Sequence, residues 1–369
     1  MPFATRPLKI AFYAPLKAPG HPAPSGDRLM ARMLVACLEA SGHTVTVASN
    51  LRAYLGRPDD VAGWFALQGA AKAECQRIEA AWAGAVPDMW FCYHPYYKAP
   101  DLIGPSLTQR FGLPYVTCEA SYSARRNIGI WAEMQARVLA MVKGAALNLC
   151  LTERDRIGLL AADPGGKVVR FPPFLDSKPF LGDPRPEPGH LVTVAMMRAG
   201  DKLQSYGLLA QALARLPEKL DWRLSVAGDG PQRAEVQALF AGLPAQRIAW
   251  VGQLSQQAVA DLLARAAVYV WPGSGEAYGL AYLEAQAAGV PVVAQGVAGV
   301  PEVVADRLTG LLTAGGDVAA FAKAIQTLLT DAPLRTRLAK AARQRVQERH
   351  EMADAVLRLD RLLQGIVHP

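Results

Sequence analysis

Residues 268–302, VYVWPGSGEAYGLAYLEAQAAGVPVVAQGVAGVPE, carry the clearest fold signal in the chain. Its apolar start, 268–271, is followed by a Pro-Gly pair and predicts a buried strand that ends in a turn. A helical pattern then begins near Gly279 and stops at Gly289, a good helix C-terminus. The apolar run 290–294 predicts the next strand. This strand–loop–helix–strand unit presents its loop at the carboxyl end of a parallel sheet, where open α/β folds bind ligands.

Two glutamates flank the start of this helix, Glu276 in the loop and Glu284 inside the helix. The start of a helix carries unpaired N–H groups and is a natural anion cradle. Because eight helical residues span about 12 Å, the two carboxylates could hold opposite ends of one ligand with a phosphate between them. Carboxylates accept hydrogen bonds from sugar hydroxyls, which favours a nucleotide-sugar with Glu276 on the hexose and Glu284 on the ribose. The backbone expected to line the cradle belongs to Ala277, Tyr278, Gly279 and Leu280.

The alternative is that both glutamates are ordinary solvated helix surface, the commoner fate of such a pair. The surroundings of Glu284 argue against it, because its neighbours Leu280, Leu283, Ala285 and Ala288 are apolar. A partly buried carboxylate needs partners.

The length and composition favour two medium-sized domains. The 369 residues are 51% hydrophobic, and no apolar run is long enough to span a membrane. We expect no signal peptide. The five cysteines are an odd number without metal-ligand spacing, and most lie in apolar strand or helix patterns, so we expect reduced core thiols in a cytoplasmic protein.

The net charge of +7 is uneven along the chain. Residues 1–175 carry 19 Lys and Arg against 13 Asp and Glu, a balance of +6, and residues 176–369 carry 20 against 19, a balance of +1. A basic first half suits peripheral contact with an anionic membrane, a phosphorylated acceptor or, least well, nucleic acid. A solvated surface without a specific partner remains the alternative.

In the second half, two cations follow the first predicted strand, 191–195. Arg198 and Lys202 suit a diphosphate, since arginine binds it bidentately and lysine acts as a point charge. A later strand runs into Gly228-Asp-Gly-Pro, which is not a dinucleotide fingerprint because Arg233 stands where the third glycine would be.

In the first half, polar residues follow several predicted strands. Ser25 and Gly26 open the first helix and could approach a phosphate or sugar, or could simply cap the helix. Glu119 ends a strand, where it would face a ligand held by the second half. The long helix expected at 59–84 places Phe65 in the core. The candidate acceptor contacts are His94, Tyr97, Lys98 and Tyr122.

A Pro-rich segment, 172–188, is the clearest linker and divides the chain. We expect a first domain at 1–175, a second domain at 176–345, and a C-terminal helix, 346–369, that packs back on the first domain. That helix would continue a single long one from about Ala332 to Gly365.

Several motifs between Val192 and Asp331, in the right order and spacing, resemble the retaining GT-B glycosyltransferases of family 4. They are Arg198 with Lys202, Gly228-Asp-Gly-Pro231, Trp250-Val-Gly252, the Glu276/Glu284 pair, Ala288-Gly-Val-Pro-Val292, Gly299-Val-Pro-Glu302 and Thr309-Gly-Leu-Leu312. The first half matches more loosely, through Ser25-Gly26 and Gly42-His-Thr-Val.

The resemblance implies an α/β enzyme of GT-B fold, with two Rossmann-like doubly wound domains facing across a cleft. It implies that the first domain, 1–175, is acceptor-binding and that the second, 176–345, is nucleotide-sugar-binding. It implies transfer of a hexose from a UDP- or GDP-sugar to a glycan, lipid or small-molecule acceptor, with retention and without metal or cofactor. By this analogy Arg198 and Lys202 neutralise the leaving diphosphate, Glu276 binds the transferred sugar, and Val251 and Gly228 belong to the donor site. The implied setting is polysaccharide or glycolipid biosynthesis in the cytoplasm or at the inner membrane face.

The chain departs from the family pattern in a few places. Glu119, an expected catalytic residue, stands where relatives often have a histidine that contacts the sugar, and Leu203 replaces a glycine after Lys202. Two alternatives stay open: a non-catalytic protein of GT-B fold that binds sugar nucleotides, and a GT-B sugar-nucleotide epimerase.

Overall fold

The computed structural model describes residues 6–367, which divide into two units of similar size. Unit 1 comprises the chain up to Pro172 together with the segment from Met352, and unit 2 is Pro173–Glu351. We expected domain boundaries after residues 175 and 345. The boundaries between the two units of the structure lie after residues 172 and 351.

Unit 1 is a six-stranded parallel sheet in the order β2-β1-β3-β4-β5-β6. The strands are β1 (Lys9–Tyr13), β2 (Thr44–Val47), β3 (Met89–Tyr93), β4 (Tyr115–Cys118), β5 (Leu147–Cys150) and β6 (Val168–Arg170). The helices between them are α1 (Gly26–Ala40), α2 (Val61–Ala81), α3 (Gly104–Phe111), α4 (Ile130–Gly144) and α5 (Glu153–Ala162), with a short 3₁₀ turn, η1 (Ala124–Arg126). Because β3 to β5 are buried throughout, they consist almost entirely of apolar residues, as parallel strands covered on both faces require.

Unit 2 is a second six-stranded parallel sheet, in the order β12-β11-β10-β7-β8-β9. Its strands are β7 (His190–Val194), β8 (Arg223–Ala227), β9 (Ile248–Gly252), β10 (Val268–Val270), β11 (Val292–Gln295) and β12 (Gly310–Thr313). Its helices are α6 (Asp201–Leu213), α7 (Arg233–Leu239), α8 (Gln256–Ala264), α9 (Leu280–Ala287), α10 (Val318–Thr330) and α11 (Ala332–Arg349). The strand order reverses between β7 and β10, so the loops after these strands lie side by side.

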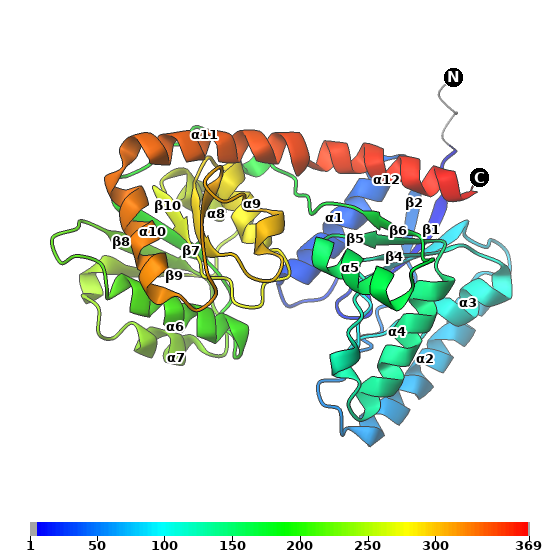
Figure 1. Ribbon diagram of the computed structural model, residues 1–369. Coiled ribbons are helices and arrows are strands. Elements are labelled where there is room, and N and C mark those ends of the chain that lie inside the picture. The colour runs from blue at the N-terminus through cyan, green and yellow to red at the C-terminus, as the bar shows by residue number, and fades with distance from the viewer. Residues whose placement is uncertain (1–5, 368–369) are drawn as a thin grey trace. The chain divides into compact units, whose positions relative to one another are not determined.

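The final helix, α12 (Met352–Val367), returns to unit 1 and lies beside α1 (Figure 1). It buries Ala355, Leu359 and Leu363, and the backbone carbonyl of Val356 accepts a hydrogen bond of 3.3 Å from the Ser41 hydroxyl. The expectation that the C-terminal helix packs on the first domain is confirmed.

The prediction of a single long helix at 332–365 is wrong. The helix is interrupted at His350 and Glu351, between α11 and α12. The backbone N–H of Leu175 donates to the carbonyl of His350 at 2.9 Å, and the His350 ring lies 2.7 Å from the carbonyl of Pro173. This contact with the incoming linker interrupts the helix where the chain leaves unit 2.

The expected position of Phe65 in the core is also wrong. On α2, Trp64 and Ile78 are buried, whereas the Phe65 side chain is 67% exposed.

Candidate active site

The loop after β10 and the start of α6 meet at the point where the strand order of unit 2 reverses. The hydroxyl of Ser205 on α6 accepts a 2.9 Å hydrogen bond from the backbone N–H of Ser274 and donates to the carbonyl of Asp201 at 2.8 Å. Gly275, at φ 69°, lies so close to Asp201 that a Cβ atom would fall 2.1 Å from the Asp201 carboxylate. The left-handed backbone at this position favours glycine, and the Ser274–Ser205 hydrogen bond ties the loop to α6.

This arrangement brings Lys202 and Glu276 together. The Lys202 ammonium donates to Oε1 of Glu276, and the indole N–H of Trp271 donates to the same oxygen at 2.9 Å. The Glu276 side chain is only 15% exposed, so it does not point into bulk solvent. With both donors on Oε1, Oε2 remains available to accept a hydrogen bond from a ligand.

Trp271 is a component of the site that the sequence pattern did not indicate. Its ring is buried 4.8 Å from the ring of Tyr206, and its backbone carbonyl accepts a 3.0 Å hydrogen bond from the Tyr282 hydroxyl. The apolar neighbours of Trp271 predict only a core strand residue. The sequence offers one signal for the Trp271–Glu276 hydrogen bond. A buried indole N–H needs a partner, and the carboxylate nearest to Trp271 in the sequence is that of Glu276.

We expect Trp271→Phe to lower the catalytic rate about 10- to 100-fold, because a hydrogen bond to a charged group contributes roughly 1.5–3 kcal/mol. The ring packing is kept while the N–H that orients Glu276 is lost. Steady-state kinetics should show the loss mainly in kcat, with the affinity for nucleoside diphosphate unchanged.

Tyr206→Phe is the matched control for this change, because it removes a buried hydrogen bond to the Ala195 carbonyl beside the same ring and leaves Glu276 untouched. Equal losses in the two variants would mean that Trp271 has only a packing role.

The start of α9 follows directly after Glu276. Gly279, at φ 82°, is the cap, and within residues 6–367 the N–H groups of Gly279 and Leu280 have no hydrogen-bond acceptor. Tyr278 and Leu280 are buried and Ala277 is exposed. Free N–H groups of this kind can receive an anion.

Glu284 lies one helical turn further on and is half-buried. Burial raises the pKa of its carboxyl from 4.5 to about 7, and no side chain among the described residues hydrogen-bonds to it. Such a carboxylate is suited to accept hydrogen bonds from a ligand.

Glu284 also gives a pH-dependent prediction. Below about pH 4.5 the carboxyl is protonated in both folded and unfolded chains, so it does not affect folding; between pH 4.5 and 7 the unfolded chain ionises first, and stability is lost as the pH rises. We expect Glu284→Gln to be more stable than the wild type by about 1–3 kcal/mol at pH 8 and equally stable at pH 4. Urea unfolding at the two pH values measures this difference, and no gain at pH 8 would contradict the raised pKa of Glu284.

The other expected donor residues of unit 2 lie around this centre. Arg198 is exposed and makes no ion pair within the described part of the chain. Gly228, at φ 146°, packs so closely against the Ala195 carbonyl that a Cβ would lie 1.9 Å from it. Val251 is 39% exposed on the edge strand β9, and no contact joins it to Lys202 or Glu276.

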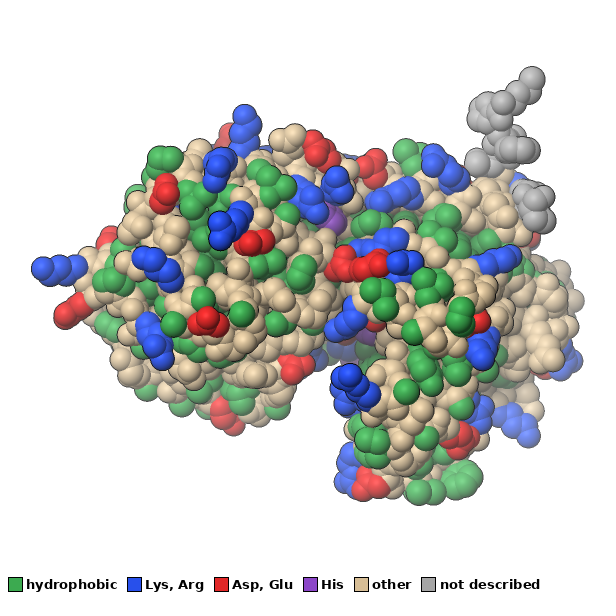
Figure 2. Space-filling model, viewed as in Figure 1, with side chains coloured by type: hydrophobic (Ala, Val, Ile, Leu, Met, Phe, Trp, Pro, Cys, Tyr) green, Lys and Arg blue, Asp and Glu red, His purple; other side chains and the backbone are tan. Residues whose placement is uncertain are grey.

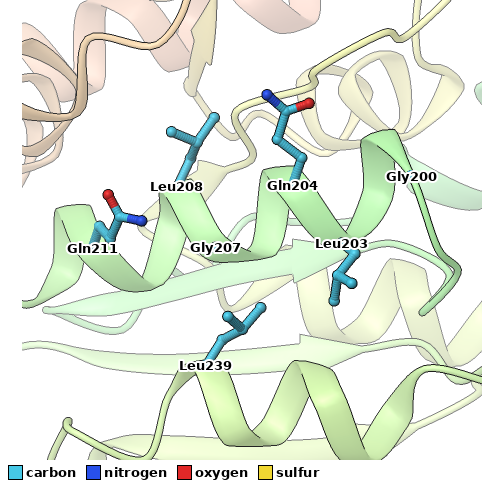
Figure 3. Close-up of a pocket in the computed structure, with 7 residues that line it drawn as sticks. All are labelled: Gly200, Leu203, Gln204, Gly207, Leu208, Gln211 and Leu239. Carbon is cyan, nitrogen blue, oxygen red and sulfur yellow. The ribbon is translucent and has the colours of Figure 1, made fainter.

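A shallow apolar hollow on the same unit lies between α6 and α7 (Figure 3). Leu203, Gly207 and Leu239 line it, and neither Lys202 nor Glu276 does. The leucine that departs from the family pattern thus faces this hollow and not the ion pair.

The expected residues of unit 1 lie at the carboxyl ends of its strands. His94 after β3 and Glu119 after β4 both have left-handed backbones, at φ 57° and 60°, a strain that is common at functional sites. Nδ1 of His94 lies 3.3 Å from the Asp27 carboxylate. Burial alone would lower the pKa of His94, but the carboxylates of Glu119 and Asp27 raise it to about 9.

Glu119 is almost fully buried, and its Oε2 atom has no hydrogen-bond partner within residues 6–367. Burial raises the pKa of this carboxyl to about 7 in spite of the opposing charge of His94. Ser25, by contrast, caps α1 through a 3.2 Å hydrogen bond to the N–H of Arg28, and Gly26 is the first residue of that helix. Tyr97 and Lys98 lie together after β3, and Tyr122 packs against the core of unit 1.

Comparison with known proteins shows similarity in sequence and in fold. Residues 185–345 match the family model "Glycosyl transferases group 1". A D-inositol 3-phosphate glycosyltransferase of Streptomyces avermitilis is 29% identical over 297 residues, covering 72% of this chain and 63% of that protein. The chain thus spans a little under two thirds of that relative.

Solved structures show the same fold. Sucrose-phosphate synthase from Thermosynechococcus elongatus has a TM-score of 0.77 at 22% identity, over 97% of this chain and 99% of that one. Anabaena HepE in complex with UDP-glucose has a TM-score of 0.73 at 14% identity, over 97% and 100%.

The fold is therefore GT-B, with two Rossmann-like units, as expected. Residues 185–345 of unit 2 thus match the glycosyl transferases group 1 model, and the named relative is a glycosyltransferase.

Proposed function

We propose that the protein is a retaining glycosyltransferase of family 4 that transfers a hexose from a UDP- or GDP-sugar to a glycan, lipid or small-molecule acceptor. The observation that carries the proposal is the Lys202–Glu276–Trp271 contact beside the start of α9. A cation lies there beside N–H groups and a carboxylate oxygen that have no hydrogen-bond partner within residues 6–367, and a sugar diphosphate needs this set of groups. The HepE structure with UDP-glucose supports a nucleotide-sugar donor, since it shares this fold.

In the proposed mechanism, the bond between the anomeric carbon and the diphosphate oxygen breaks as the acceptor oxygen attacks from the same face. Lys202, with Arg198 and the N–H groups of Gly279 and Leu280, stabilises the charge that develops on the leaving diphosphate. The acceptor hydroxyl gives its proton to that diphosphate. Glu276 accepts a hydrogen bond from the sugar through Oε2, and Glu284 accepts from the ribose.

The two cations can supply the positive charge that a metal ion supplies in other transferases, so we propose a metal-independent reaction without a cofactor. For Glu119 we propose contact with the sugar from unit 1, and for Ser25, Gly26, Gly228 and Val251 a supporting role in donor binding. We also propose a cytoplasmic location with peripheral contact between unit 1 and the inner membrane face. No helix among residues 6–367 is long and apolar enough to cross a bilayer.

Thermal denaturation with UDP, GDP, ADP and their hexose conjugates tests the donor assignment, because a ligand specific for the native state raises the Tm by mass action. We expect one base to stabilise the protein selectively, and the matching sugar nucleotide then to support transfer to an acceptor panel. Stabilisation without turnover would favour a non-catalytic protein, whereas release of nucleotide without an acceptor product would favour an epimerase.

A further inference from the structure

Unit 1 carries a surface of stacked cations and aromatic rings that the proposed chemistry of unit 2 does not use. We call it the cation–aromatic strip, and it consists of Arg52, Tyr54, Tyr97, Lys98, Arg126 and Trp131. The Lys98 ammonium lies 4.7 Å from the centre of the Trp131 ring and 5.6 Å from that of Tyr97. The Arg126 guanidinium lies 5.3 Å from the Tyr97 ring, and that of Arg52 lies 4.5 Å from Tyr54.

The strip is built from segments far apart in the sequence and held together by the backbone. The N–H of Leu55 donates to the Lys98 carbonyl at 2.8 Å, and the indole N–H of Trp131 donates to the Leu55 carbonyl at 3.1 Å. The rings of Tyr97 and Trp131 pack edge to face at 5.1 Å. These residues follow β2, β3 and β4, so the strip lies at the carboxyl edge of the sheet, where α/β folds bind ligands.

None of the three cations of the strip pairs with a carboxylate among the described residues. Arg52 donates its Nε to the carbonyl of Leu16, and the charged groups of Lys98 and Arg126 contact only rings. Basic side chains also gather over the part of unit 1 formed by α2 and α4 (Figure 2).

The acids nearby are already paired with other residues. Asp59 binds Arg57, and Glu133 binds Arg137 and the Trp64 indole. Asp101 is buried and accepts hydrogen bonds from Trp90 and Tyr115. Among the described residues, none of these acids forms an ion pair with a cation of the strip.

We propose that the cation–aromatic strip binds an anionic group, a phosphate or a carboxylate, carried by the acceptor. The ring faces hold the cations in place and are themselves covered by them, so the partner is recognised by charge and not by stacking on the rings. A phosphate group on a soluble saccharide and one in a lipid headgroup offer the same chemistry. The role of the anion as acceptor rests on the proposed function, whereas its binding to unit 1 does not.

The binding experiment uses the full chain and records the indole N–H resonance of Trp131 by NMR, assigned with Trp131→Phe. The probes are glucose 6-phosphate, glucose, and phosphatidylcholine vesicles with and without phosphatidylglycerol. We expect glucose 6-phosphate to shift this resonance and glucose to leave it unchanged. The double variant Lys98→Gln/Arg126→Gln should weaken the apparent affinity for glucose 6-phosphate at least tenfold.

Lys143→Gln is the matched control, since this exposed lysine lies at the opposite end of α4 from Trp131 and its loss changes the charge of the same unit. If the double variant does not fold, Arg126→Gln alone can be tested in its place. We expect this single variant to fold, because the Arg126 side chain is exposed and makes no hydrogen bond to the described residues.

An equal response to glucose and glucose 6-phosphate, or equal weakening by Lys143→Gln, would overturn the proposal. Binding to phosphatidylglycerol vesicles without any response to glucose 6-phosphate would make the strip a membrane contact, and would also overturn it. If the wild-type protein transfers sugar but its Trp131 resonance does not shift, only the proposal of anion binding by the strip is contradicted. If the Trp131 resonance shifts but no sugar is transferred, only the proposed function is contradicted.

Discussion

Glu276→Gln is expected to lower sugar transfer about 100- to 1000-fold, the range found when one group that stabilises a transition state is removed. The glutamine keeps the shape of the side chain, but a neutral amide replaces the carboxylate that lies against Lys202 and the Trp271 indole. A hydrogen bond from the sugar that strengthens as charge develops at the anomeric carbon is then weakened, so the loss should fall on kcat.

The same variant should bind nucleoside diphosphate at least as tightly as the wild type, because Lys202 is released from its ion pair. Glu235→Gln is the control, since Glu235 is exposed on α7 and has no ion-pair partner in the described chain. Calorimetric titration with UDP and GDP, together with a transfer assay, separates binding from chemistry. Full turnover in Glu276→Gln would remove the main support for the proposed mechanism.

Lys202→Ala is expected to reduce both sugar transfer and nucleotide binding. Transfer should fall about 100- to 1000-fold, and the affinity for nucleoside diphosphate should also fall. Within residues 6–367 the ammonium is the only cation paired with Glu276, and its loss removes charge that the leaving diphosphate of the proposed reaction requires. Glu276 would also keep only its bond to Trp271, which should lower the Tm slightly.

Lys323→Ala provides the comparison, since this exposed lysine lies on α10 of the same unit. If purified, folded Lys202→Ala protein kept near-wild-type turnover, the assignment of Lys202 to the diphosphate would be wrong. A parallel Lys202→Arg variant distinguishes charge from geometry, because a guanidinium keeps the charge and changes its shape.

Much of the fold could be predicted from local pattern, because buried parallel strands read as short apolar runs with a turn at each end. The strand 268–271 and the helix beginning near Gly279 correspond to β10 and α9. The break at His350 could not be predicted, since no proline or glycine occurs between residues 334 and 364. Contacts of His350 with Pro173 and Leu175, more than 170 residues away, interrupt the helix there.

The candidate site was predictable only in part for the same reason. A strand followed by a polar loop indicates which residues reach the carboxyl edge of a sheet, which is why Lys202 and Glu276 could be singled out. Which loops become neighbours depends on strand order, and the pairing of β7 with β10 is a long-range event. Trp271 was missed for a different reason: its apolar neighbours predict only a core residue, although its partner Glu276 lies five residues further along the chain.

The return of α12 to unit 1 has a consequence for dissecting the molecule. A fragment that ends at Pro172 would lose the helix that packs on α1, and with it the 3.3 Å contact between His43 and Asp360 and the bond from Gln364 to the Arg6 carbonyl. Unit 1 should therefore be isolated as a circular permutant, with the last 18 residues joined ahead of the first strand, and not as a simple truncation.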